Sequence, residues 1–282
     1  MIRFPIWFIP RQLLDFSVMF ATLWCLTDSA WAVGPPKPGL AKSSWVTGVP
    51  QAETRIYGDS SWVARMQQRK VARQQTALGK SATLSQDQFT LCVLLGSYIG
   101  EAISLASAQS AYQDHLFHAS NSNTMVEYYD EVSYSQFALT GTVYGPFVSD
   151  STRSQAVNAA NGSGGYVESV VAAADASVDF RLFDNDGPDG TPNSGDDDGY
   201  VDAVGIIYPG IGNDAGDNTN FNAHMSSLSS DYTTSDIGVS GDSIKVKAYY
   251  VASEFGSNGT TIRDIGVHCH EFGHVLGLPD LY

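Results

Sequence analysis

The run His270-Glu271-Phe272-Gly273-His274 constrains the fold of this 282-residue chain more than any other feature. Two imidazoles four positions apart lie on one face of an α-helix, where both can bind the same metal ion. A glutamate between them lies beside a metal-bound water and can act as a general base. The run therefore predicts a helix and favours zinc-assisted hydrolysis. The alternative is that both histidines are core residues whose ring nitrogens are hydrogen-bonded.

The residues around this motif predict where the helix begins and ends. Its apolar face is formed by Ile262, Ile265, Val267 and Phe272. Thr260 or Thr261 can cap its start, and Gly277 permits the left-handed turn that ends a helix. Because the chain turns back at Gly277, Asp280 can reach the metal as a third protein ligand, which leaves one position for water. The alternative is that Asp280 only forms a turn with Pro279.

The other histidine and the cysteines of this region have structural interpretations. His268 lies about 200° around the helix from His270, so it points away from the metal. Cys269 is expected to be a small buried residue, as is Cys92 in a predicted strand. Two cysteines outside the leader do not form a disulfide framework.

Three separate stretches of the chain resemble the immune inhibitor A family of secreted zinc metallopeptidases. They are His-Glu-Phe-Gly-His-Val-Leu-Gly-Leu-Pro-Asp-Leu-Tyr at 270–282, the aspartate-rich run at 183–202, and Glu-Tyr-Tyr-Asp-Glu-Val-Ser-Tyr at 127–134. Two stretches depart from the family. Residues 95–101 replace its acidic turn, and Phe221-Asn222-Ala223-His224 replaces its aromatic-Ser-His run.

The resemblance implies a secreted, extracellular zinc endopeptidase, made as a prepro-protein, that acts on protein or peptide substrates. It also implies a zincin-type domain and bound calcium. Glu271 is implied as the catalytic base. The implied zinc ligands are His270, His274 and Asp280.

Family members continue well beyond the position of Tyr282. We therefore expect an N-terminal fragment of a longer peptidase, truncated at the zinc motif and without the C-terminal subdomain. The competing hypothesis is a non-catalytic, calcium-binding secreted protein, a truncated relative that has kept the motif and lost the enzyme.

The aspartate-rich run is a candidate calcium site. Seven aspartates lie between residues 184 and 202, and no Lys or Arg occurs from residue 182 to 244. Carboxylates this crowded repel one another unless a cation lies among them, and the intervening glycines allow turns that wrap oxygens around calcium. The expected ligands are Asp184, Asp186, Asp196, Asp198 and Asp202. The alternative is a solvated acidic loop.

Charge is distributed unevenly along the chain, whose net charge is −15. Residues 1–80 hold ten of the fifteen Lys and Arg and four acids, whereas residues 81–282 hold five and twenty-six. Such an acidic body argues against nucleic acid as a partner, and against attraction to anionic membranes.

The N-terminal part is expected to be removed in two steps. Residues 1–32 read as a signal peptide, with Ala30-Trp31-Ala32 as the cleavage site, and an uncleaved anchor is the alternative. After signal removal we expect no stable membrane association. Residues 33–84 read as a linker and prosegment whose cationic helix, at 62–78, keeps a zymogen latent. The alternative is an ordinary solvated helix.

Residues 85–282 are expected to form the N-terminal part of the catalytic domain. Strands are predicted at 89–95, 137–143, 200–208 and 244–251, and helices at 101–118, 124–132 and within 151–171. Strands mixed with helices predict an α+β or mixed α/β fold. From the resemblance, this is the zincin N-terminal subdomain, with a mixed sheet and an active-site helix.

Overall fold

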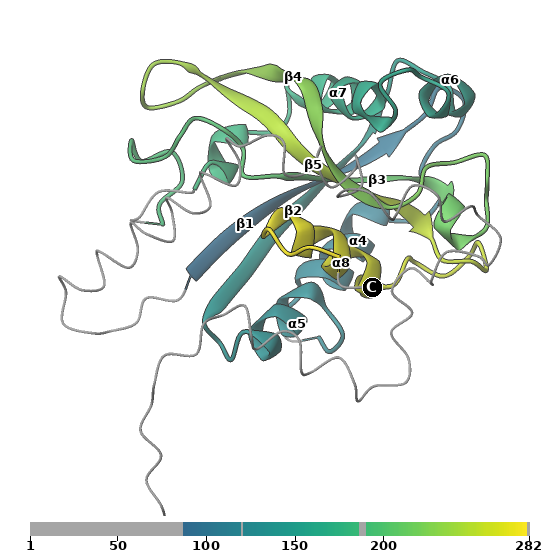
Figure 1. Ribbon diagram of the computed structural model, residues 1–282, viewed down its shortest axis with the longest axis horizontal. Coiled ribbons are helices and arrows are strands. Elements are labelled where there is room, and N and C mark those ends of the chain that lie inside the picture. Colours follow the sequence, from purple (N-terminus) through teal and green to yellow (C-terminus); the bar gives the residue numbers. More distant parts are fainter. Residues whose placement is uncertain (1–86, 120, 186–189, 281–282) are drawn as a thin grey trace, which may run out of the picture. The chain divides into compact units, whose positions relative to one another are not determined.

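A computed structural model describes residues 87–119, 121–185 and 190–280 (Figure 1). The proposed signal peptide at 1–32, the prosegment at 33–84 and its helix at 62–78 lie outside the described residues. Within the described part of the chain, no helix is both long and apolar enough to cross a bilayer.

The described residues form a five-stranded mixed sheet with the order β2-β1-β3-β5-β4. The strands are β1 (Asp87–Ser97), β2 (Phe137–Val148), β3 (Val204–Ile211), β4 (His224–Ile237) and β5 (Ser243–Phe255). The first four in sheet order run parallel, and β4 pairs antiparallel with β5 at one edge. The mixed α/β prediction is therefore confirmed, and so are the four predicted strands, whereas β4 was not predicted.

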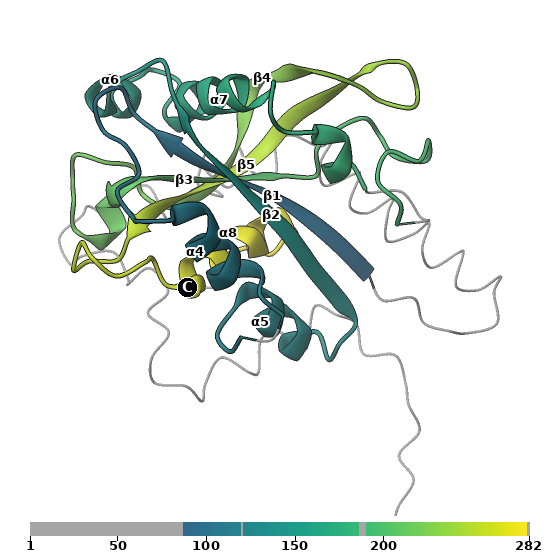
Figure 2. The ribbon, with the colours of Figure 1, turned by 180° about the vertical axis from the view of Figure 1, so that it is seen from behind.

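Helices cover both faces of this sheet (Figures 1 and 2). One face carries α6 (Arg153–Val157) and α7 (Ser163–Ala174). The other carries α4 (Ala108–Phe117), α5 (Met125–Val132) and α8 (Ile265–Val275). Two short 3₁₀ helices, η2 (Phe180–Phe183) and η3 (Asn213–Ala215), flank β3.

Strand β1 shows why both faces are covered. Leu91, Val93 and Leu95 belong to the core under α4, α5 and α8, whereas Cys92 and Leu94 belong to the core under α7. All five side chains are buried. A strand buried on both faces reads as a continuous apolar run, which is the pattern that identified it in the sequence.

The helix expected at 101–118 begins later, at Ala108. The preceding residues are held in another conformation by Glu254, whose carboxylate accepts the backbone N–H groups of Ser104 and Leu105, each at 2.6 Å. The next helix, α5, is capped at its start by Thr124, whose hydroxyl accepts the N–H of Glu127 at 3.2 Å.

Candidate metal centre

Helix α8 carries the histidine motif and packs against β4, β5 and α5. Its first residue is Ile265 and its N-cap is Asp264, so the predicted cap at Thr260 or Thr261 was wrong. The N–H groups of both threonines instead donate to the side chain of Asn258, at 3.1 and 2.9 Å. This Asx turn competes with helix formation for the same backbone groups.

Aromatic residues far apart in sequence hold α8 in place. The ring of Phe272 is fully buried and contacts the rings of Phe89, Tyr129 and Phe137, with centroids 4.9, 5.2 and 6.4 Å away. The hydroxyl of Tyr129 also donates to the carbonyl oxygen of Cys269 at 2.7 Å. These contacts fix the rotation of the helix and hence the direction of its polar face.

The two histidines of the motif face each other. His270 Nε2 and His274 Nε2 are 3.2 Å apart. His274 Nδ1 lies 2.7 Å from the carbonyl oxygen of Leu278, and because a carbonyl only accepts, Nδ1 carries the proton and Nε2 presents its lone pair. Burial lowers the pKa of His270, with a further contribution from His274, which favours the neutral form that binds metals.

Asp280 joins this pair, as the turn at Gly277 predicts. Gly277 has a φ of 86°, in the left-handed region. Asp280 Oδ1 lies 3.3 Å from both His270 Nε2 and His274 Nε2. Three donor atoms of the kinds that zinc prefers thus converge from two sides of the helix end, so this donor set fits a catalytic zinc site.

Glu271 is buried between these groups, with 3% of its surface exposed. Burial raises the pKa of Glu271 to about 8, and the nearby carboxylates of Asp280 and Asp214 add to the rise. A hydrogen bond from the backbone N–H of Met225, in β4, opposes it, as does the charge of Arg263. A cation bound at the two histidines would favour the carboxylate form.

The surroundings of Glu271 contain an ion pair that the sequence did not reveal. Arg263 Nη2 pairs with Asp214, and both side chains are largely buried. Asp214 also accepts the N–H of Ala223 at 3.3 Å, just before β4 begins. The pair therefore connects the segment that precedes α8 with the start of the edge strand. No sequence signal joins residues 49 positions apart.

His268 and Cys269 have the structural roles that were predicted. His268 is fully buried, with its Nδ1 3.5 Å from the hydroxyl of Tyr250, and burial lowers its pKa to about 3. Cys269 and Cys92 are buried thiols, and burial raises the pKa of each.

The candidate calcium ligands are only partly brought together. Asp184 is buried and accepts the N–H of Gly199 at 3.1 Å, so the two ends of the aspartate-rich run lie side by side. Asp198 accepts the N–H of Tyr200 at 2.9 Å, Asp196 accepts the hydroxyl of Ser194, and Asp202 donates its N–H to the carbonyl oxygen of Phe183 at 2.9 Å. Asp186 lies outside the described residues. Calcium binding stays a prediction.

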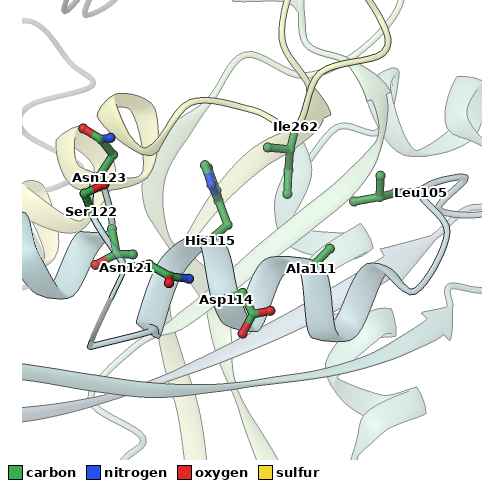
Figure 3. Close-up of a pocket in the computed structure, with 9 residues that line it drawn as sticks. Leu105, Ala111, Asp114, His115, Asn121, Ser122, Asn123 and Ile262 are labelled. Atoms are coloured by element: carbon green, nitrogen blue, oxygen red, sulfur yellow. The ribbon is translucent and has the colours of Figure 1, made fainter.

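Among the described residues, one group of three side chains could hold a metal ion, and its members are His270, Glu271 and His274. One potential ligand atom from each lies within 4.8 Å of the others. A surface hollow of about 570 Å³ lies elsewhere, between α4, the start of α5 and Ile262 (Figure 3). His115 and Asp114 of α4 line this hollow, and none of the metal-centre residues does.

Two comparisons relate this chain to known proteins. A family model described as the immune inhibitor A peptidase M6 catalytic domain matches residues 103–282. Immune inhibitor A of Bacillus thuringiensis subsp. alesti is 27% identical over 176 residues, which cover 56% of this chain. The matched region spans 25% of the length of that relative.

Proposed function

Because the chain belongs to the immune inhibitor A family of M6 peptidases, we propose that it carries the zinc site and the general base of a secreted endopeptidase. The observation that supports this most directly is the approach of Asp280 Oδ1 to within 3.3 Å of both His270 Nε2 and His274 Nε2. These three residues would hold the metal, and the fourth position would be left for water.

The chain's own residues divide the chemistry as follows. Zinc, when bound, supplies a Lewis acid that polarises the scissile carbonyl and lowers the pKa of water. Glu271 accepts the proton of the attacking water and later delivers it to the leaving amine. The N–H of Met225 orients the carboxylate of Glu271 for both transfers.

The substrate backbone would lie along β4. This strand forms one edge of the sheet, and its second residue, Met225, lies beside Glu271. An extended peptide that adds to a sheet edge is held by main-chain hydrogen bonds, which suits an endopeptidase that accepts many sequences. The scissile bond would then lie beside the general base.

Calcium, secretion and latency complete the proposal. The aspartate-rich run at 183–202 would bind calcium and hold the segment between η2 and β3 in place. Residues 1–32 would direct export, and the basic segment at 33–84 would keep the acidic body latent until it is cut.

Zinc content and hydrolysis of a protein substrate, measured on the purified chain, test the proposal. We expect one zinc per chain and hydrolysis that a chelator abolishes. Glu271→Gln should keep the zinc and lose hydrolysis at least about 1,000-fold, whereas His274→Ala should lose the zinc. His118→Ala is the matched control, because this exposed histidine lies outside the site. Hydrolysis retained by Glu271→Gln would refute the role of the base.

A further inference from the structure

His224, the first residue of β4, lies in a hydrogen-bonded cluster on the sheet face opposite to the metal centre. Its Nε2 is 2.7 Å from the hydroxyl of Ser163, at the start of α7. That hydroxyl is 2.9 Å from the hydroxyl of Tyr249, in β5. The other ring nitrogen, Nδ1, is 2.9 Å from the carbonyl oxygen of Asn222. Three separate segments therefore meet at one imidazole.

The proton positions in this cluster follow from its geometry. A carbonyl only accepts, so His224 Nδ1 carries a proton and donates it to Asn222. Burial lowers the pKa of His224, which keeps the ring neutral and makes Nε2 an acceptor. Ser163 therefore donates to His224, and Tyr249 donates to Ser163. Each hydrogen bond of this cluster thus has an assigned donor and acceptor. Such a fully paired network holds the ring of His224 in one position.

The residue after His224 faces the metal centre. Side chains alternate along a strand, so Met225 belongs to the core under α8 while its neighbours face α7. The backbone of Met225 lies within hydrogen-bonding reach of the Glu271 carboxylate and contributes to lowering its pKa. On the far side of Met225, Ser226 pairs in register with Tyr249, whose hydroxyl also bonds to it. The strand is thus anchored on both sides of the group that contacts Glu271.

We propose that His224, held by Ser163 and Tyr249, is a positioning residue for hydrolysis, because it fixes the strand whose Met225 N–H orients Glu271. It does not contact the metal ligands and acts only through the backbone of β4. This inference rests on the proposed function.

Kinetics of the zinc-loaded full chain test the inference. For His224→Ala we expect kcat to fall about 10- to 100-fold, because a displaced general base lowers the rate of the chemical step. KM should change by less than about twofold, and zinc content should stay the same. His224→Gln retains an acceptor for Ser163 and should recover most of kcat. His224→Asn retains only a donor for Asn222 and should not.

The matched control is Thr234→Val, which removes another buried hydrogen bond of the same strand. Thr234 donates to the carbonyl oxygen of Ile244 at 2.8 Å, near the other end of β4. Its loss should lower stability without lowering kcat. An equal fall in kcat for Thr234→Val and His224→Ala would mean that general weakening of β4 accounts for the effect, and the inference would be overturned.

Amide hydrogen exchange gives a readout that does not depend on activity. The amide of Met225 should exchange slowly in the wild type. Its exchange rate should rise at least about tenfold in His224→Ala and should stay unchanged in Thr234→Val. Unchanged exchange in His224→Ala would overturn the inference. If the wild type has no zinc-dependent hydrolysis, the proposed function and the catalytic part of the inference fail together. The exchange result then still decides whether His224 holds the strand.

Discussion

The backbone N–H of Leu278 donates to the carbonyl oxygen of Gly273 at 3.0 Å, across the turn that ends α8. The N–H of Gly277 donates to the carbonyl oxygen of His274 at 2.9 Å, and together the two bonds form a Schellman motif. This motif reverses the chain within three residues of the helix end. As a result, Asp280 lies beside the two histidines instead of a further turn along the helix axis.

Replacing Gly277 with alanine should weaken zinc binding. An alanine with a left-handed φ costs roughly 1–2 kcal/mol, and relieving that strain moves both Asp280 and the carbonyl of Leu278. We expect zinc affinity to fall about 10- to 100-fold, measured by competition with a chelator. Gly266→Ala is the control, because it lies in the first turn of α8 with no atom within 4 Å of the added carbon. Equal zinc affinity in both variants would contradict the role of the turn.

The metal-free protein should lose stability as the pH rises from about 6.5 to 8, because of Glu271. Its pKa is raised to about 8 in the folded protein, so the folded state keeps a proton that the unfolded chain has already released. The stabilisation is complete below the unfolded value, near pH 4.5, and is lost as the pH passes the folded value. Urea unfolding at several pH values measures the slope.

Glu271→Gln should remove this slope, because glutamine does not titrate. The histidines whose pKa values are lowered by burial contribute mainly below pH 6.5, and they are common to both proteins, so the difference isolates Glu271. If the free energy of unfolding changes with pH in the same way in the wild type and in Glu271→Gln, between about pH 6.5 and 8, then Glu271 is ionised in the metal-free fold.

Glu254→Gln should destabilise the fold. Glu254 is fully buried, and besides the two N–H groups before α4 it accepts the N–H of Gly210 at 3.0 Å. A glutamine amide places its own N–H groups against one of these donors. We expect a loss of roughly 2–3 kcal/mol in the free energy of unfolding. Glu168→Gln, at an exposed position of α7, is the control and should change stability by less than about 0.5 kcal/mol. If Glu254→Gln also loses less than about 0.5 kcal/mol, Glu254 does not stabilise the fold through these N–H groups.

Removal of calcium should lower the melting temperature and expose the aspartate-rich run to proteolysis. Asp184 is the buried member of the proposed ligand set, so Asp184→Asn should reduce the response to calcium. Asp242→Asn, an exposed aspartate in the turn between β4 and β5, serves as the comparison. If a calcium-selective chelator changes neither melting nor proteolysis of the wild type, the run is a solvated loop.

The sequence predicted the helix that carries the two histidines, and the turn that follows it, better than their surroundings. His270, His274 and Gly277 have local meanings, because helical spacing and a left-handed turn depend on residues a few positions apart. Strand β4 could not be predicted in the same way. Its sequence is rich in Ser, Thr and Asp, since an edge strand is exposed along much of its length, and the apolar alternation that marks a strand is weak.

Contacts between distant segments account for the remaining differences. The start of α4 is set by Glu254, some 150 positions away. The Arg263–Asp214 pair and the cluster around His224 likewise join residues from separate elements. Such partners have no mutual spacing that a single sequence reveals.

The contact between Phe89 and Phe272 also sets an order of events during synthesis. The chain leaves the ribosome from its N-terminal end, so β1 is available long before the residue that packs against it has been made. Helix α8 is the last of the described elements along the chain, so the histidines and Glu271 can reach their places only after the strands that α8 contacts have been made.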